Sequence, residues 1–316
     1  MLVVSLGVLA VSSCAKEGFS KGEEADMTLS VMIPDGVVTK AYGDGKYADI
    51  NLIVGVCGED GNEKFRKNVT LEKGNFETTV PIRLVIGKKY QLVLWAQYGD
   101  AYGNPATMPL DAVSMDYSAS NRENKDAFYA HVPVFEVRQD FSQSVVLRRP
   151  FAQLNFATRQ GDIDLSLAEG HLGLSNAAEV TISSVANRLN LLTGEATYVD
   201  PVSSEVKVGA KVTVPATAFP KGADGKYPTI EVEKDIYEIL SMNYLLVADS
   251  QSADGKTTVD LTLTVGELTL DVPSVQLKRN WRTNIVGQLL TAEGTFKVSI
   301  EPDFQNVINQ NWNAGN

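Results

Sequence analysis

Apolar side chains recur at every second position in many short runs of this 316-residue chain. Successive side chains of a β-strand point to opposite faces, so such runs predict strands with one buried face. In "MTLSVMI", residues 27–33, the odd positions are all apolar: Met27, Leu29, Val31 and Ile33. Similar alternation recurs at 50–56, 90–96, 152–156, 257–265, 268–272, 281–289 and 296–300.

Turn-forming dipeptides separate these runs, among them Asp60-Gly61, Asp224-Gly225 and Asp254-Gly255. Glycine adopts positive φ without strain and aspartate hydrogen-bonds to its own backbone, so these pairs predict hairpins or short loops. No segment shows helical periodicity over more than a few turns, although 235–249 also fits a short helix that leads into a buried strand. Many short strands with few helices predict an all-β protein built from antiparallel β-sandwiches.

The chain is long enough for two domains of ordinary size. Pro150 marks the predicted boundary, because proline lacks an N–H for a strand ladder and restrains the residue before it. We therefore expect an N-terminal β-sandwich domain at 27–149 and a C-terminal β-sandwich domain at 150–316. Asn, Asp, Ser and Tyr are frequent at 101–130, which predicts a long loop region that binds or covers something.

The residues before the first predicted strand are typical of an export signal. Residues 2–11 are uncharged and too few to cross a bilayer, and small serines precede Cys14. We predict a signal peptide at 1–13, lipidation of Cys14 at a site that resembles the bacterial lipobox, and a flexible tether at 14–26. An ordinary secretory peptide with an incidental cysteine is the alternative.

Charge and the spacing of reactive residues argue against nucleic-acid binding and catalysis. The net charge of −11 repels nucleic acid and anionic membrane faces. His131 and His171 lie far apart in the sequence and neither has the spacing of a metal site, so no cofactor or metal is expected. Asp162 and Asp164, on one side of a segment predicted to be extended, leave calcium as an alternative. Cys57 is predicted to be a buried core residue, and no enzymatic activity is expected.

An exposed, flat group of aromatic rings would indicate a sugar-binding surface. Trp95 and Trp281 lie in or beside predicted strands, where packing in the core or against a sheet is the commoner role. A surface-exposed glycan-binding lipoprotein is therefore the alternative function. It requires that these tryptophans and the tyrosines of 101–130 form one exposed platform.

Four features together resemble the fimbrillin family of Bacteroidetes, the lipoprotein-derived subunits of type V pili. The resemblance spans almost the whole chain and implies two tandem, transthyretin-like β-sandwich domains with Greek-key topology. It also implies a lipid-anchored protein of the outer membrane and cell surface, with other pilin subunits as partners and host or bacterial surface molecules as candidate ligands. The features are Cys14 in its lipobox-like context, "VTKAYGDG" at 38–45, "VVLRRPFAQLNFAT" at 145–158, and "VPSVQLKRNWRTNIVGQLLT" at 272–291 before "FKVSIEPDF".

In that family, a trypsin-like or arginine-specific protease cuts the loop after the first strand, which is then lost. The resemblance places the cut at Lys40, a lysine where arginine is commoner, and makes the strand at 27–33 the displaced one. Loss of a strand leaves an apolar groove and an unpaired sheet edge, which a strand from a neighbouring subunit can fill. The candidate donor is the C-terminal segment, with its apolar residues Phe304, Val307, Ile308 and Trp312. An edge strand or tail of the chain's own domain is the alternative for this segment.

The implied function is that of a stalk, anchor or tip subunit of a fimbria that assembles by donor-strand exchange. This account requires that the first strand can leave its sheet. A first strand paired on both flanks, together with a Lys40 that no protease can reach, would contradict it.

Overall fold

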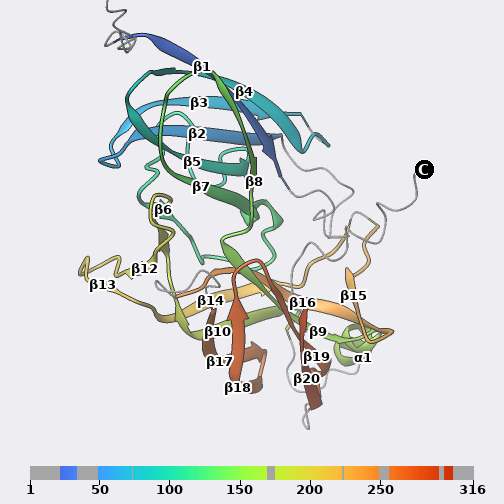
Figure 1. The fold of residues 1–316 in the computed structure, drawn as a ribbon. Helices are drawn as coiled ribbons and strands as arrows, with labels where there is room; N and C mark the ends of the chain where they lie inside the picture. The colour runs from blue at the N-terminus through green and yellow to red at the C-terminus, as the bar shows by residue number, and fades with distance from the viewer. Residues whose placement is uncertain are drawn as a thin grey trace, which may run out of the picture.

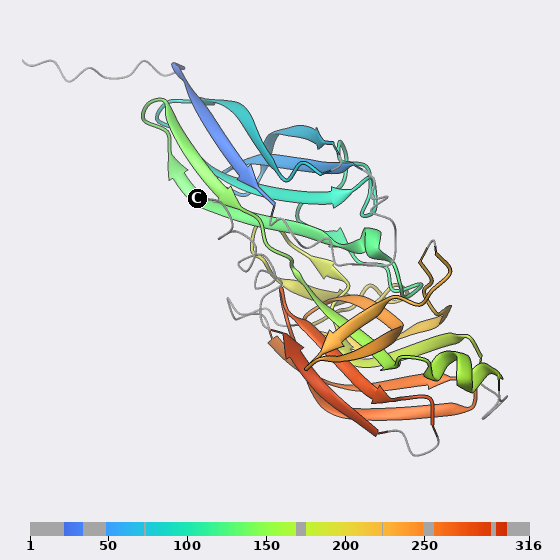
Figure 2. The ribbon, with the colours of Figure 1, turned by 90° about the vertical axis from the view of Figure 1, so that its right-hand side faces the viewer.

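The computed structural model of the chain describes residues 22–33, 49–72, 74–168, 175–222, 224–248, 256–291 and 295–301. Within these ranges nearly all regular structure is β-strand, apart from a short helix α1 (Asp162–Ala168) and a single 3-10 turn η1 (Glu123–Lys125). The all-β fold and the strands expected from the alternating runs are therefore confirmed. Two sandwiches, one from each half of the chain, are stacked in the views of Figure 1 and Figure 2.

The first sandwich consists of a three-stranded and a four-stranded sheet. In the three-stranded sheet, of order β4-β1-β8, β1 is antiparallel to β4 and parallel to β8. In the four-stranded sheet, of order β3-β2-β5-β7, all neighbours are antiparallel. The strands are β1 (Glu24–Met32), β2 (Ile50–Gly58), β3 (Glu63–Leu71), β4 (Glu77–Val85), β5 (Lys89–Tyr98), β7 (Ala127–Glu136) and β8 (Phe141–Val146).

The second sandwich has a five-stranded sheet, of order β15-β16-β9-β19-β20, and a four-stranded sheet, of order β14-β10-β17-β18. In the five-stranded sheet β9 is antiparallel to β16 and parallel to β19. The strands are β9 (Phe151–Arg159), β10 (Ala177–Val185), β14 (Ala210–Ala218), β15 (Thr229–Val232), β16 (Asp235–Leu246), β17 (Lys256–Val265), β18 (Leu268–Lys278), β19 (Arg282–Gln288) and β20 (Thr295–Glu301).

The two sandwiches share one topology. The order β4-β1-β8, with one antiparallel and one parallel pair, is repeated by β16-β9-β19. The all-antiparallel order β3-β2-β5-β7 is repeated by β14-β10-β17-β18. Strands β15 and β20 are additions to the second sandwich, one at each edge of its larger sheet.

A small sheet of order β13-β12-β11-β6 joins the two halves of the chain. Its strands are β6 (Val113–Ser114), β11 (Arg188–Leu189), β12 (Ala196–Val199) and β13 (Val206–Lys207). Strand β6 comes from the predicted long loop at 101–130 and pairs with β11 of the second half. The loop at 101–130 was expected to bind or to cover something, and it covers the junction between the sandwiches.

Three apolar cores explain why some strands have one buried face and others have two. One core lies inside each sandwich, and a third lies between them, with Trp95, Phe151, Leu189 and Tyr244 among its members. Strands β2, β5, β9 and β16 contribute to two cores each, so both of their faces are buried. The expectation of a single buried face is therefore wrong for the runs at 50–56, 90–96 and 152–156. The described residues 235–248 contain the strand β16 and no helix, so the helical alternative for this segment is wrong.

Residues 162–168 form helix α1, so the expectation of an extended segment carrying Asp162 and Asp164 is wrong. Both carboxylates lie in the first turn of the helix, where its dipole favours negative charge. Thr158 Oγ1 also donates a hydrogen bond to Asp162 Oδ2 at 2.9 Å. These contacts account for the acidic pair as a helix start.

Candidate functional site

Strand β1 holds the three-stranded sheet of the first sandwich together. It forms nine residue pairs with β4 and six with β8. Within the described residues, β4 and β8 have no other strand partner in this sheet. β1 is therefore the only strand that links them.

The side chains of β1 alternate between core and solvent as the sequence predicts. The four apolar residues expected on its buried face are 3% exposed or less: Met27, Leu29, Val31 and Ile33. The strand begins at Glu24, three residues earlier than expected, because Ala25 continues the same buried row. This row packs in the first core with residues of β4 and β5, including Val80, Ile82, Leu84, Leu92 and Leu94.

Polar contacts fix both ends of the strand. At its start, Asp26 N donates to Asp140 Oδ1 at 2.9 Å, and Arg83 Nε lies 3.2 Å from Asp26 Oδ1. The Arg83 pair is exposed, so it contributes little to stability. At the other end, Ile33 N donates to Phe76 O at 2.8 Å. The strand is thus held chiefly by its two ladders and its buried row.

The expectation that loss of the first strand would leave one unpaired edge is wrong. Because β1 lies between β4 and β8, its loss would leave two facing edges with a groove between them. One half of the condition that would contradict strand exchange, pairing on both flanks, is therefore met. The other half concerns Lys40, which lies outside the described residues.

Several other predicted residues also lie outside the described residues, so their roles stay predictions. The lipidation site Cys14 and the second histidine, His171, are among them. So is the candidate donor segment, with Phe304, Val307, Ile308 and Trp312.

The aromatic residues near the sandwich junction do not form the exposed platform that the glycan-binding alternative requires. Trp95 is fully buried, and its Nε1 donates to Gln97 Oε1 at 3.0 Å. Tyr102 packs edge-on against Trp95, with ring centroids 5.1 Å apart, and stacks on Phe151 at 5.8 Å. Tyr117 is partly buried against the same core, and its hydroxyl donates to Ala186 O at 2.6 Å. Burial raises the pKa of both tyrosines. These rings build the third core and present no sugar shelf.

Trp281 lies at the surface but is not open on both faces. Lys278 Nζ lies 4.3 Å from the centroid of its ring, a cation–π contact. Trp281 therefore packs beside the sheet, as predicted from the sequence.

A buried ion pair lies where the chain passes from β8 to β9. Arg149 Nε and Nη2 donate to the two carboxylate oxygens of Asp126 at 2.7 and 2.6 Å. Burial raises the pKa of the Asp126 carboxyl, and the Arg149 guanidinium opposes that rise. The guanidinium also lies 4.5 Å from the ring centroid of Phe128. The sequence placed Arg149 at the boundary but gave no signal for its partner, which is distant along the chain.

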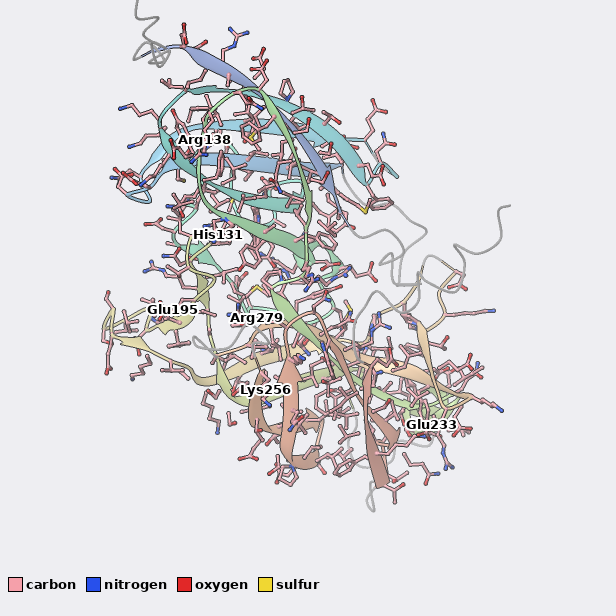
Figure 3. All side chains as sticks on the ribbon, viewed as in Figure 1. His131, Arg138, Glu195, Glu233, Lys256 and Arg279 are labelled. Atoms are coloured by element: carbon pink, nitrogen blue, oxygen red, sulfur yellow. The ribbon has the colours of Figure 1, made fainter. Side chains whose placement is uncertain are left out.

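Reactive side chains are isolated in the part of the chain that the structure describes. Cys57 is a buried free thiol whose pKa is raised to about 11, chiefly by burial. His131, labelled in Figure 3, lies 3.0 Å from Gln91 Oε1 through its Nε2, and burial lowers its pKa. No group of three metal-ligating side chains occurs among the described residues. None of the helices formed by these residues has the length and apolar character needed to span a membrane.

Comparisons with known proteins give a family and distant structural neighbours. The profile of a family of unknown function (DUF6562) matches residues 19–314. No curated protein matches the chain. Similar solved structures include the tip fimbrial protein Mfa3 of Porphyromonas gingivalis, at 11% identity and a TM-score of 0.46, covering 88% of this chain and 99% of that one. A fimbrial assembly protein of Parabacteroides distasonis, at 13% identity and a TM-score of 0.42, covers 88% and 100%.

Proposed function

The chain belongs to the DUF6562 family, a family of unknown function, and we propose that it is a subunit of a cell-surface fimbria. In this proposal strand β1 is replaced, during assembly, by a strand from a neighbouring subunit. The protein serves as a stalk, anchor or tip component and has no enzymatic role. The sequence resemblance to fimbrillins supports the proposal, as does the core that β1 covers, whereas the pairing of β1 on both flanks opposes its release.

The observation that carries the proposal is that β1 alone joins β4 to β8 within the described sheet. Its removal would unpair nine positions on β4 and six on β8. It would also expose the core that Met27, Leu29, Val31 and Ile33 cover, worth about 1.5–3 kcal/mol for each large side chain that is reburied. Binding of a replacement strand would therefore strongly stabilise a first sandwich that lacks β1.

The two-sided position of β1 changes how exchange would proceed. An uncut strand with two ladders is held too firmly to leave spontaneously, so a cut in the segment between β1 and β2 is required. After the cut, the same two ladders and buried row would favour a longer or better-fitting donor over β1. If the donor strand replaces β1 one residue pair at a time, the whole groove is never exposed at once. The added strand gains backbone hydrogen bonds from both neighbours and places its alternate side chains in the pockets of the groove.

The remaining parts of the proposal concern residues outside the described ranges. Cys14 carries the lipid that anchors the subunit to the outer membrane. Lys40 is the position of the cut. The donor strand comes from the C-terminal segment, with the side chains of Phe304, Val307, Ile308 and Trp312 entering the groove.

An engineered cut tests this function. In the full chain, Lys40→Arg is treated with an arginine-specific protease, and the products are run on unheated gels with detergent. The proposal expects a ladder of oligomers from the cut protein and only monomers from Lys40→Gln, which the protease cannot cut at that position. Truncation before Trp312 should remove the ladder. A protein that is cut at position 40, as shown by its intact mass, and stays monomeric would contradict the proposal.

A further inference from the structure

The two sandwiches differ at one edge that their shared topology makes directly comparable. Strand β8 of the first sandwich corresponds to β19 of the second, because each is the parallel neighbour of the central strand. In the second sandwich β19 is covered by β20, which pairs with it over seven positions. Among the described residues β8 has no such neighbour. The first sandwich therefore leaves open an edge at which this fold accommodates a further strand.

Strand β20 shows what an added strand does at this position. Paired residues of antiparallel strands share a face, and Val298 of β20 is opposite the core residue Ile285 of β19. Phe296 and Ile300 lie on the same face as Val298. These three side chains are 37–42% exposed, so the added strand widens the sheet and leaves an apolar row open to solvent.

Strand β8 lacks the features that usually block a sheet edge. Prolines and charged residues protect edge strands from pairing with other chains. The sequence of β8 is FSQSVV, with neither. Among the described edge strands longer than two residues, each of the others has at least one: β3, β4, β7, β14, β15, β18 and β20.

The free stretch is short and lies beside an apolar groove. Beyond the end of β8, Arg148 pairs with Tyr129 of β7, so the open edge is limited to residues 141–146. A groove of about 480 Å³ opens between β7 and the start of β8, near Arg138 in Figure 3. Phe135 and Phe141 line it and pack edge-on, with their ring centroids 5.6 Å apart.

We propose that β8 pairs, antiparallel and edge to edge, with β8 of a second copy of this chain. The strand is complementary to itself when Gln143 of one copy lies opposite Gln143 of the other. Phe141 then lies opposite Val145 on the core-facing side, and Ser142 lies opposite Ser144 on the outer side. Neither side places a charge opposite a like charge within the strand. The pairing joins two three-stranded sheets into one continuous sheet.

The pairing does not rest on strand exchange, because β8 presents its outer edge whichever strand lies on its inner side. It also makes a prediction about salt. Each copy carries a net charge of −11, so the two copies repel one another at long range. Since salt screens such repulsion, dimerisation should strengthen as ionic strength rises.

Sedimentation of the full chain with a charged edge tests the pairing. Ser144→Lys places a charge on the exposed side of β8, and we expect it to weaken dimerisation about tenfold or more. The matched control is Ser30→Lys, because Ser30 of β1 is the register partner of Ser144 and is exposed on the same face, one strand inward. The control should dimerise like the parent. Equal behaviour of the two variants, or a parent chain that is monomeric at about 1 mM, would overturn the proposal.

A cysteine cross-link tests the register. Cys14→Ser removes one thiol, and the other native cysteine, Cys57, is buried. In this background Gln143→Cys therefore supplies the thiol that reacts. Opposite Cα atoms of antiparallel strands lie about 4.5–5.5 Å apart, which a disulfide can span. Mild oxidation should yield a covalent dimer from Gln143→Cys. Ser142→Cys should yield much less, because in this register residue 142 of one copy lies opposite residue 144 of the other. Equal yields from both variants, or no dimer from either, would overturn the register.

Discussion

Arg149 and Asp126 form a buried, two-pronged ion pair at the point where the chain leaves the first sandwich and enters the second. The side chains are 1% and 4% exposed. Removal of one partner leaves the other charge buried without compensation. We therefore expect Arg149→Met to lower the free energy of unfolding by about 3–5 kcal/mol.

Urea unfolding of three variants measures this effect. Arg148→Met, at the exposed neighbouring position, is the matched control and should change stability by less than about 0.5 kcal/mol. The double change Asp126→Leu with Arg149→Met removes both charges and should recover much of the loss. If the single change at 149 costs no more than the change at 148, the pair does not stabilise the junction.

The buried row of β1 should be much more sensitive than its exposed row. Leu29 is fully buried in the first core, so Leu29→Ala should cost about 2–5 kcal/mol in thermal or chemical unfolding. Ser30→Ala, at the adjacent exposed position, should cost little. Similar losses at both positions would show that β1 is not seated in its sheet as described.

The thiol of Cys57 should be unreactive in the folded protein. Because its pKa is raised to about 11, only about one thiol in a thousand is ionised at pH 8, and burial also blocks access to it. In a Cys14→Ser background, a colorimetric thiol reagent at pH 8 should react only after denaturant is added. A surface cysteine introduced by Ser203→Cys should react at once. Rapid reaction of the folded parent would contradict the burial of Cys57.

Glycan binding through the aromatic residues should be absent. Trp95 is buried, and Lys278 covers one face of the Trp281 ring. We expect that Trp281→Ala leaves the signal on a glycan array unchanged. Binding that disappears in this variant would instead favour the glycan-binding alternative.

The alternating runs predicted the strands at 50–56, 90–96 and 152–156, but not that both faces of these strands are buried. Where one face meets solvent, the runs also predicted which side chains are buried. Leu29 and Ser30 illustrate the reason, because burial and residue type alternate together along β1. The same rule could not resolve 235–249, since both faces of β16 are buried and no polar row marks its period. The prediction of an extended segment at Asp162 and Asp164 was wrong for another reason: a helix as short as α1 leaves almost no periodic signal.

Features that depend on long-range pairing were not readable from the sequence. That β1 would lie between β4 and β8 depends on partners distant along the chain, and local pattern does not specify them. Trp95 was predicted to pack in a core, but the sequence did not indicate that this core lies between two sandwiches. Likewise Arg149 stood out beside Pro150, whereas its partner Asp126 did not.

Replacement of β1 by another subunit's strand is the central claim, and the mass of the assembled species tests it most directly. Oligomers formed by Lys40→Arg after arginine-specific cleavage are isolated and denatured, and the released peptides are identified by mass spectrometry. The claim predicts that the peptide containing Met27–Ile33 is missing from all interior subunits and is recovered free in solution. Oligomers that retain this peptide in every subunit would contradict strand exchange.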